Sequence, residues 1–318
     1  MIISTSFRID RYFKRVLFKN SKHELVVDRL RQEIDATRNL GSRSSHKNRV
    51  TAVNAFERFI NETMPCPICV DELTAEHIKA FNRWIIDNGN KEGYARLHLR
   101  CLRGLINRFI PNGNELFRLV RTSNCQTEKR AVSEETIKEI RDYDLSAKPN
   151  EALARDIFLF CFYGMGIPLI DAAMLKKTQL KNGHISYRRQ KTGRLVTIAV
   201  GPELEQLIKH LSQNDSAYLL PILTSADRTE TQRQYKRFYQ RYMRALRKLS
   251  VGLNSECHLT SYTPRHSWAS IAYKNGIDIN VIARALGHAN TNITYLYIKE
   301  INDTQLECAN RLVMQALL

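Results

Sequence analysis

The chain has 318 residues with 49 Lys+Arg against 32 Asp+Glu, which gives a formal net charge of +17. A hydrophobic fraction of 43% is ordinary for a folded protein and excludes the disordered and fibrous classes. No apolar run approaches the roughly 20 residues that a membrane-spanning helix needs. The basic charge indicates a polyanionic partner, and nucleic acid is favoured over a membrane surface because no amphipathic basic terminal helix is evident.

The N-terminal residues lack the charged and then apolar order of a signal peptide, so we expect a cytoplasmic protein. Seven scattered cysteines do not predict a disulfide framework. Cys66 and Cys69 have metal-ligand spacing, but the nearest histidine, His77, leaves a zinc site one ligand short. We therefore expect reduced cysteines and neither a metal nor another cofactor.

The first part of the chain predicts a helical DNA-binding region. Residues 1–20 mix cations with aromatic side chains and are interpreted as a basic arm on DNA or simply a first helix. Residues 21–120 predict a bundle of four helices, three of which are marked by Leu25–Asn39, Val50–Ile60 and a segment capped by Thr74. A fourth, from about 93 to 109, is expected to pack by one face and to present arginines to DNA, namely Arg96, Arg100 and Arg103.

A second domain is predicted over residues 132–318, after an exposed linker at 121–131. Ser133 caps its first helix, and residues 155–163 are apolar nearly all round, as in a central buried helix. Gly164, Gly166 and Pro168 interrupt that helix, and Asp171 to Lys177 is expected to continue as another.

One β region follows, and the remainder after Pro202 is expected to be helical. The turn dipeptide Asn182-Gly183 separates strands of a small sheet, with Lys191 at a hairpin tip. In the segment 229–249, five residues are expected to face inward: Tyr235, Tyr239, Tyr242, Leu246 and Leu249. Its cations share another face and predict phosphate contacts, namely Arg237, Arg241, Arg244 and Lys248.

The C-terminal part concentrates residues suited to phosphoryl transfer. Thr263 caps a helix that carries Arg265, a second helix starts at Asp278 and stops at His288, and Tyr297 comes nine residues later. An arginine can neutralise phosphate oxygens, a histidine can donate a hydrogen bond, and a tyrosine can attack as a covalent nucleophile.

These segments resemble the tyrosine recombinase (phage integrase) family. The run from Thr260 to Ala269 is similar to the family's His-x-x-Arg box, with Tyr262 where histidine is usual. Leu286 to His288, followed by Thr294 and Tyr297, resembles the box with the second histidine and the nucleophile, and Lys191 resembles the hairpin lysine. The resemblance implies a mainly α protein: an N-terminal helical, SAM-like core-binding bundle and a mixed α+β catalytic domain with a small antiparallel sheet.

The resemblance also implies a role for each matching residue. Tyr297 attacks the scissile phosphate, forms a 3′-phosphotyrosyl link and frees a 5′-hydroxyl; its spacing from His288 favours it over Tyr295. Arg265 clamps the phosphate oxygens, His288 donates a hydrogen bond to them, and Lys191 protonates the departing 5′-oxygen. Tyr262 can still donate a hydrogen bond in place of the usual histidine. The phosphodiester retains its energy, so neither ATP nor a metal is needed.

One position departs from the family pattern. Met165 stands where the family's first active-site arginine follows the buried helix, and methionine cannot neutralise a phosphate. Losing such a contact commonly costs about two to three decades in rate unless another cation substitutes. Arg155, Arg188 and Arg189 are the candidates, and the sequence does not choose between them.

Three functions follow as hypotheses. The leading one is a site-specific recombinase of a mobile element, nucleoid-associated, monomeric in solution and tetrameric on double-stranded DNA, with a host DNA-bending factor as a further candidate partner. Integration, excision and inversion stay open, and a helix at 305–318 either packs on a neighbouring protomer or closes its own domain. The alternative is a catalytically weak DNA-binding protein with the recombinase fold and a structural or regulatory role. A type IB topoisomerase is disfavoured by the compact length.

Overall fold

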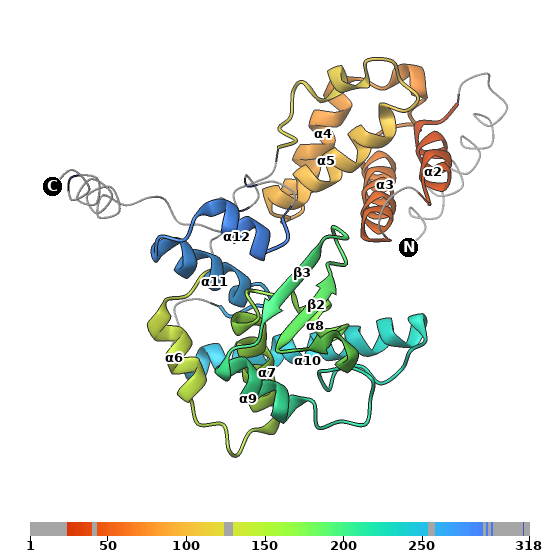
Figure 1. Cartoon of the computed structure of the whole chain (residues 1–318). Coiled ribbons are helices and arrows are strands. Elements are labelled where there is room, and N and C mark those ends of the chain that lie inside the picture. The colour runs from red at the N-terminus through yellow and green to blue at the C-terminus, as the bar shows by residue number, and fades with distance from the viewer. Residues whose placement is uncertain are drawn as a thin grey trace. The chain divides into compact units, whose positions relative to one another are not determined.

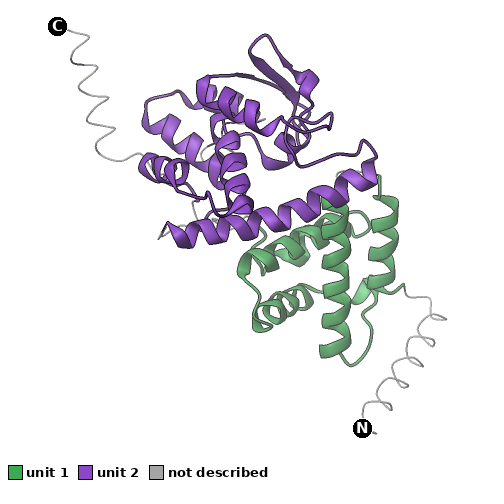
Figure 2. Cartoon of the chain, turned by 90° about the horizontal axis from the view of Figure 1, so that it is seen from below, with its two compact units in different colours: residues 1–127 green, residues 128–318 purple. Residues whose placement is uncertain are grey.

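The computed structural model describes residues 24–39, 43–123, 130–253 and 258–288, together with residues 291, 294 and 314. The chain divides into two compact units, residues 1–127 and 128–318, which Figure 2 colours separately. This division falls inside the range that the sequence predicts as the linker. The predicted arm at 1–20, Tyr297 and the predicted helix at 305–318, except for Met314, lie outside the described residues.

In its described residues, the first unit is a bundle of the four predicted helices (Figure 1). They are α2 (Val26–Ala36), α3 (Arg43–Thr63), α4 (Ala75–Asp87) and α5 (Glu92–Ile106), with short 3₁₀ turns at η1 (Val70–Glu72) and η2 (Gly113–Phe117). Helix α3 packs against α2 and α5, and α4 packs against α5 and η2. The apolar positions that predicted these helices are buried in one core, around Phe56, Phe59 and Phe81.

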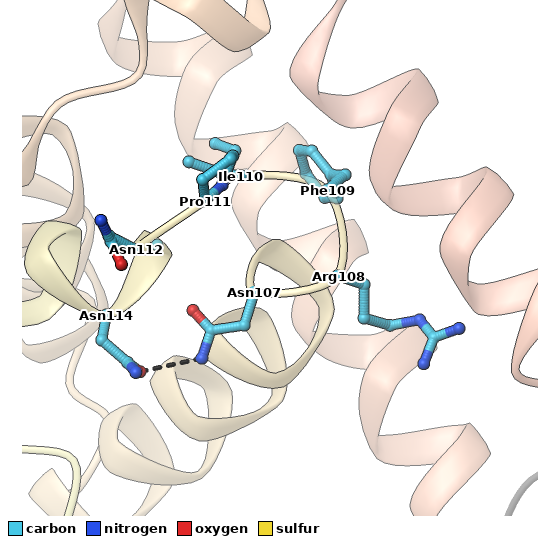
Figure 3. A pocket seen from close by; sticks show the side chains of 8 residues that line it. Asn107, Arg108, Phe109, Ile110, Pro111, Asn112 and Asn114 are labelled. Carbon is cyan, nitrogen blue, oxygen red and sulfur yellow. Dashed lines mark hydrogen bonds between the residues drawn. The ribbon is translucent and has the colours of Figure 1, made fainter.

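The ends of these helices are set by the residues that the sequence singles out. The Thr74 hydroxyl accepts the backbone N–H of His77 at 3.4 Å, as expected of an N-cap. After α5 the chain turns through residues 107–114 and forms the hollow drawn in Figure 3, across which Asn107 Nδ2 donates to Asn114 Oδ1 at 2.8 Å. The cation of this turn, Arg108, donates to Glu33 at 2.7 Å and so serves to hold α2. We assign the hollow a structural role.

The second unit is built around a buried central helix. Helices α6 (Glu134–Asp142) and α7 (Pro149–Tyr163) confirm the predicted cap and the predicted all-round burial: Ser133 Oγ accepts the N–H of Thr136 at 3.2 Å, and residues 156–161 of α7 are buried. Helices α9 (Pro202–Leu211), α10 (Arg228–Gly252) and α11 (Thr263–Lys274) pack on α7. The helical bundle and the mixed α+β unit expected from the sequence are thus both present.

The sheet has three antiparallel strands in the order β1-β2-β3 (Figure 1). They are β1 (Leu180–Lys181), β2 (His184–Arg188) and β3 (Leu195–Ala199), and β2 pairs with β3 from His184 opposite Ala199 to Arg188 opposite Leu195. Alternate residues of β2 and β3 are buried against the core, since side chains of a strand point to opposite faces in turn. The predicted hairpin is therefore confirmed, and Lys191 lies in its loop.

Four local predictions are corrected. The helix expected over Asp171–Lys177 is the shorter α8 (Leu169–Ala173), followed by a 3₁₀ turn, η3 (Lys177–Gln179). Residues 212–227, expected to be helical, form turns in which Asn214 and Ser216 bond to the backbone. On α10, Phe238 is buried while Tyr239 is 38% exposed, so Tyr239 does not face inward. The N-cap of α11 is Tyr262, one residue before the predicted Thr263.

Candidate active site

Among the predicted site residues that the structure describes, Arg265 is the most deeply buried. It lies in the first turn of α11 and is 2% exposed. Its Nη1 donates to the carbonyl of Gly166 at 2.8 Å, and its Nη2 donates to the carbonyl of Leu286 at 2.6 Å and to His288 Nε2 at 2.8 Å. The guanidinium therefore joins the loop after α7 to the end of the next helix, α12 (Ile279–Ala285).

His288 lies three residues beyond the end of α12 and is 6% exposed. Arginine can only donate hydrogen bonds, so Nε2 accepts from Arg265, and Nδ1 carries the proton that it donates to Thr294 Oγ1 at 2.9 Å. Burial, together with the positive charges of Arg265, Arg189 and Lys191, lowers the pKa of His288 to about 3. The imidazole is therefore neutral at physiological pH.

A second arginine, Arg189, lies in the same region. It follows β2 and is 8% exposed, and its Nη1 donates to the carbonyls of Leu286 at 3.0 Å and Gly287 at 3.3 Å. Its Nε lies 3.5 Å from Asp171 Oδ2, and Asp171 Oδ1 accepts the N–H of Gln190 at 2.9 Å. Burial raises the pKa of Asp171, while the N–H of Gln190 and the charge of Arg189 act against that rise. Asp171 is thus the counter-ion of Arg189.

The hairpin loop reaches the same place. Lys191 is exposed, and its charge is felt at His288. Arg194 Nη1 donates to the carbonyl of His288 at 2.7 Å. A hollow opens beside these residues, and Arg194, Arg284 and His288 line it. A cationic recess beside a neutral histidine is suited to hold a phosphate group.

The remaining predicted catalytic residues are less connected. Tyr262 is 49% exposed, and its described contacts are with Thr260 and with the ring of His266, whose centroid is 6.3 Å away. Its catalytic role stays a prediction. Tyr297 lies outside the described residues, so the position of the nucleophile relative to Arg265 stays a prediction as well.

The predicted DNA-binding side chains fall into two groups. Arg96, Arg100 and Arg103 are half-buried on α5 and bond to residues 122 and 123, at the start of the predicted linker. Arg237, Arg241, Arg244 and Lys248 are exposed on α10, where Lys248 Nζ donates to Glu151 at 3.0 Å. Their contacts with DNA stay predictions.

The described part of the chain contains no cluster of three or more residues suited to hold a metal ion. Cys66 and Cys69, the pair with metal-ligand spacing, are free thiols there. Within the same residues no helix is both long and apolar enough to cross a membrane.

Comparison with known proteins identifies the family. Residues 130–303, more than half of the chain, match the phage integrase family. The chain therefore belongs to the phage integrase family.

Two curated relatives are tyrosine recombinases. XerA of Pyrococcus furiosus is 25% identical over 181 residues, covering 55% of this chain and 58% of that protein. XerD of Halalkalibacterium halodurans is 34% identical over 58 residues, covering 18% of this chain and 19% of that protein. The matched region thus spans less than two thirds of each relative.

Solved structures share the fold. The Tn1549 transposon integrase in complex with transposon right end DNA has a TM-score of 0.68 at 13% identity, covering 91% of this chain and 99% of that one. The lambda integrase tetramer bound to a Holliday junction has a TM-score of 0.66 at 15% identity, covering 91% of this chain and 82% of that one. At these identities the likeness shows the fold.

Some members of the site were not assigned a role from the sequence. Thr294, which is fully buried, fixes the tautomer of His288, and Asp171 balances Arg189. Arg194 holds the carbonyl of His288. The position of Thr294 in the second box is a sequence signal for its role. The roles of Asp171 and Arg194 could not be predicted from the sequence, because they depend on contacts of the hairpin with α8 and with the segment after α12.

Proposed function

We propose that this protein is a site-specific DNA recombinase that cuts and rejoins DNA through a 3′-phosphotyrosyl intermediate at Tyr297. The observation that carries the proposal is the buried pair of Arg265 and His288, bonded at 2.8 Å beside a cationic hollow. Family membership adds the reaction class. The relatives solved as integrase–DNA complexes, one of them a tetramer, support double-stranded DNA as substrate and a tetramer as the working assembly.

In the reaction, the Tyr297 hydroxyl releases its proton to solvent as its oxygen attacks phosphorus, and the bond to the 5′-oxygen breaks. Arg265 neutralises non-bridging oxygens as charge develops on them, and Lys191 gives its proton to the departing 5′-oxygen. Rejoining reverses these steps with the 5′-hydroxyl of another strand as the attacking group. Because the phosphotyrosyl bond retains the energy of the phosphodiester, the reaction needs no ATP.

Before DNA binds, the donors of Arg265 are engaged by the protein itself. The carbonyls of Gly166 and Leu286 and the Nε2 atom of His288 accept its N–H groups. A phosphate must therefore take over at least part of these bonds, and Nε2 of His288 must gain a proton to donate to the phosphate. We infer that DNA binding completes the site, because the reactive geometry differs from the one described.

Met165 supports a second candidate, a DNA-binding protein with the recombinase fold and weak catalysis. This residue directly precedes Gly166, the acceptor of an Arg265 hydrogen bond, and so lies beside the site without a charge. Under this candidate the protein binds its DNA site but cleaves it poorly or not at all.

A nicked duplex separates the two candidates. The site is first selected from a random duplex library by binding, and a nick is then placed so that the short 5′-hydroxyl strand diffuses away after cleavage. The recombinase forms a covalent protein–DNA adduct in the presence of EDTA, Tyr297→Phe forms none, and Tyr295→Phe behaves as wild type. A wild-type protein that binds this duplex without forming an adduct refutes the recombinase and leaves the binding protein.

A further inference from the structure

With methionine at position 165, the proposed reaction is one cation short. A phosphate under attack accumulates charge on its non-bridging oxygens, and a single guanidinium leaves part of that charge unbalanced. Three arginines are candidates by sequence, and their contacts in the second unit separate them.

Arg155 and Arg188 are committed elsewhere. Arg155, on α7, donates from Nε to Asp156 at 2.9 Å and from Nη1 to the carbonyl of Tyr143 at 3.0 Å. Arg188 is exposed on β2 and donates to the carbonyl of Gly193 in its own hairpin at 3.2 Å. The partners of both arginines lie outside the pair formed by Arg265 and His288.

Arg189 shares an acceptor with Arg265. The carbonyl oxygen of Leu286 accepts Nη1 of Arg189 at 3.0 Å and Nη2 of Arg265 at 2.6 Å. Because both nitrogens bond to one oxygen, they lie less than about 6 Å apart, which is close enough for strong mutual repulsion in a buried site. Two arginines this close together can both bind the same anion.

Among the described residues of this region, the charges do not balance. We call Arg189, Arg265, Lys191 and Asp171 the cation cluster; it contains three positive groups and one carboxylate. Asp171 lies 3.5 Å from Arg189, and its side chain is 1% exposed. His288, which contacts Arg265, is neutral and adds no negative charge. The surplus favours an incoming anion.

We propose that Arg189 supplies the phosphate-binding cation that Met165 does not; this rests on the function proposed above. Nη1 is engaged with carbonyls and Nε faces Asp171, so Nη2 is the group with which Arg189 contacts a non-bridging oxygen. Arg189 transfers no proton and forms no bond to phosphorus. It stabilises the charge that develops while Tyr297 replaces the 5′-oxygen.

A purely structural role makes a different prediction. Arg189 connects the hairpin to the segment after α12. If this were its whole role, its replacement would affect folding but would not change how the reaction rate depends on the charge of the phosphate. The test therefore needs a substrate in which the charge of the phosphate itself is changed. Replacing one non-bridging oxygen of the scissile phosphate by methyl removes that charge.

The experiment compares adduct formation on the nicked duplex for wild type, Arg189→Met, Arg189→Lys and the control Arg188→Met. Arg189→Met lowers the rate about 100- to 1,000-fold, while the Kd for the duplex changes by less than about threefold. For each protein we take the ratio of its rate on the methylphosphonate duplex to its rate on the ordinary duplex. This ratio should be at least about tenfold higher for Arg189→Met than for wild type. Arg188→Met keeps the wild-type ratio, and Arg189→Lys falls between.

This ratio is measured within one protein sample, so partial misfolding of a variant cancels. An Arg189→Met protein that reacts as fast as wild type overturns the proposal, and so does a lowered rate with an unchanged ratio. A wild type that forms no adduct on a duplex it binds overturns the proposed function instead. The two failures are therefore distinguishable.

Discussion

Two glycines determine how closely the buried arginines approach their neighbours. A Cβ added at Gly166 would lie 3.0 Å from Cα of Arg265, and one added at Gly287 would lie 2.6 Å from Cδ of Arg189. Both glycines have positive φ, +67° and +63°, which other residues adopt at a cost. Gly166 and Gly287 thus leave the space that Arg265 and Arg189 occupy.

Gly287→Ala tests this packing. The added methyl group must displace Arg189, so we expect the free energy of unfolding to fall by about 2–4 kcal/mol. Gly183→Ala is the matched control, because Gly183 has φ +70° with no atom within 4 Å of the added Cβ. It should cost about 1–2 kcal/mol. Equal losses in urea unfolding would show that the contact with Arg189 is not tight.

The neutrality of His288 makes stability depend on pH. Its pKa is about 3 in the folded protein and near 6.5 in an unfolded chain. As pH falls from 6.5 towards 3, the unfolded chain binds a proton that the folded chain refuses, so stability is lost over this window. Between pH 7 and pH 5 the contribution of His288 is about 2 kcal/mol.

The measurement uses the Trp84→Phe background, in which Trp268 reports on the second unit alone. His288→Gln should lose about 2 kcal/mol less than the parent protein between pH 7 and pH 5. His266, whose pKa burial lowers to about 4, supplies a further loss that both proteins share. The control His184→Gln, on the exposed side of β2, keeps the parental loss. An unchanged loss in His288→Gln contradicts the assigned pKa.

At the residue scale, the sequence predicts the members of the site more successfully than it predicts their hydrogen-bond and ion-pair partners. Arg265, His288 and Lys191 were expected in one site, and the structure places Arg265 and His288 in contact, with Lys191 near enough for His288 to feel its charge. The charge balance was not predictable, because Asp171 becomes the partner of Arg189 through the meeting of α8 and the hairpin. The choice of Arg189 over Arg155 and Arg188 likewise depends on contacts between segments far apart in sequence.

At the scale of elements, helix α12 positions His288. Asp278 caps this helix by accepting the N–H groups of Asn280 at 2.8 Å and Val281 at 3.4 Å. The backbone N–H of His288 in turn donates to the carbonyl of Ala283 at 2.9 Å. A short helix between two such contacts fixes the chain that leads to the site.

Asp278→Ala should lower the free energy of unfolding by about 1 kcal/mol, because the first N–H groups of α12 lose their acceptor. Asp278→Asn keeps a side-chain oxygen and should cost less than half as much. Urea unfolding of the two variants beside wild type makes the comparison. A loss as large in the asparagine variant as in the alanine variant would exclude a capping role.

Capped and strongly periodic helices were predictable, and the exceptions have local causes. Thr74, Ser133 and Asp278 mark helix starts correctly because their side chains satisfy backbone groups within the same turn. The helix expected at Asp171–Lys177 is displaced because Pro168 starts α8 earlier and Asp171 is used as a counter-ion. Residues 212–227 turn because Asn and Ser side chains compete for the backbone.

At the scale of the whole molecule, the net charge of +17 divides into general and specific parts. Lys191, Arg189 and Arg265 have individual positions in the second unit, whereas the exposed cations of α10 form a single-sign stripe. Lys248 differs from the others because Glu151 offsets its charge at 3.0 Å. Phosphate contacts made by such a stripe raise affinity without selecting a sequence.

The salt dependence of DNA binding tests the stripe. The double variant Arg237→Gln, Arg241→Gln should reduce the slope of log K against log salt by about 2, since each lost phosphate contact removes about 0.9. Lys248→Gln should change the slope by less than either arginine replaced singly. Titration of a fluorescent duplex at several salt concentrations gives these slopes. An unchanged slope in the double variant would remove α10 from the DNA interface.

In the proposed reaction, Tyr297 becomes joined to the 3′ end of a DNA strand. The most direct measurement is peptide mapping of the adduct trapped on the nicked duplex, together with phosphorylation of the freed strand by polynucleotide kinase. We expect a nucleotide on Tyr297, none on Tyr295, and a free 5′-hydroxyl that accepts the label. A nucleotide on any other residue, or a freed strand that already ends in a 5′-phosphate, would contradict it.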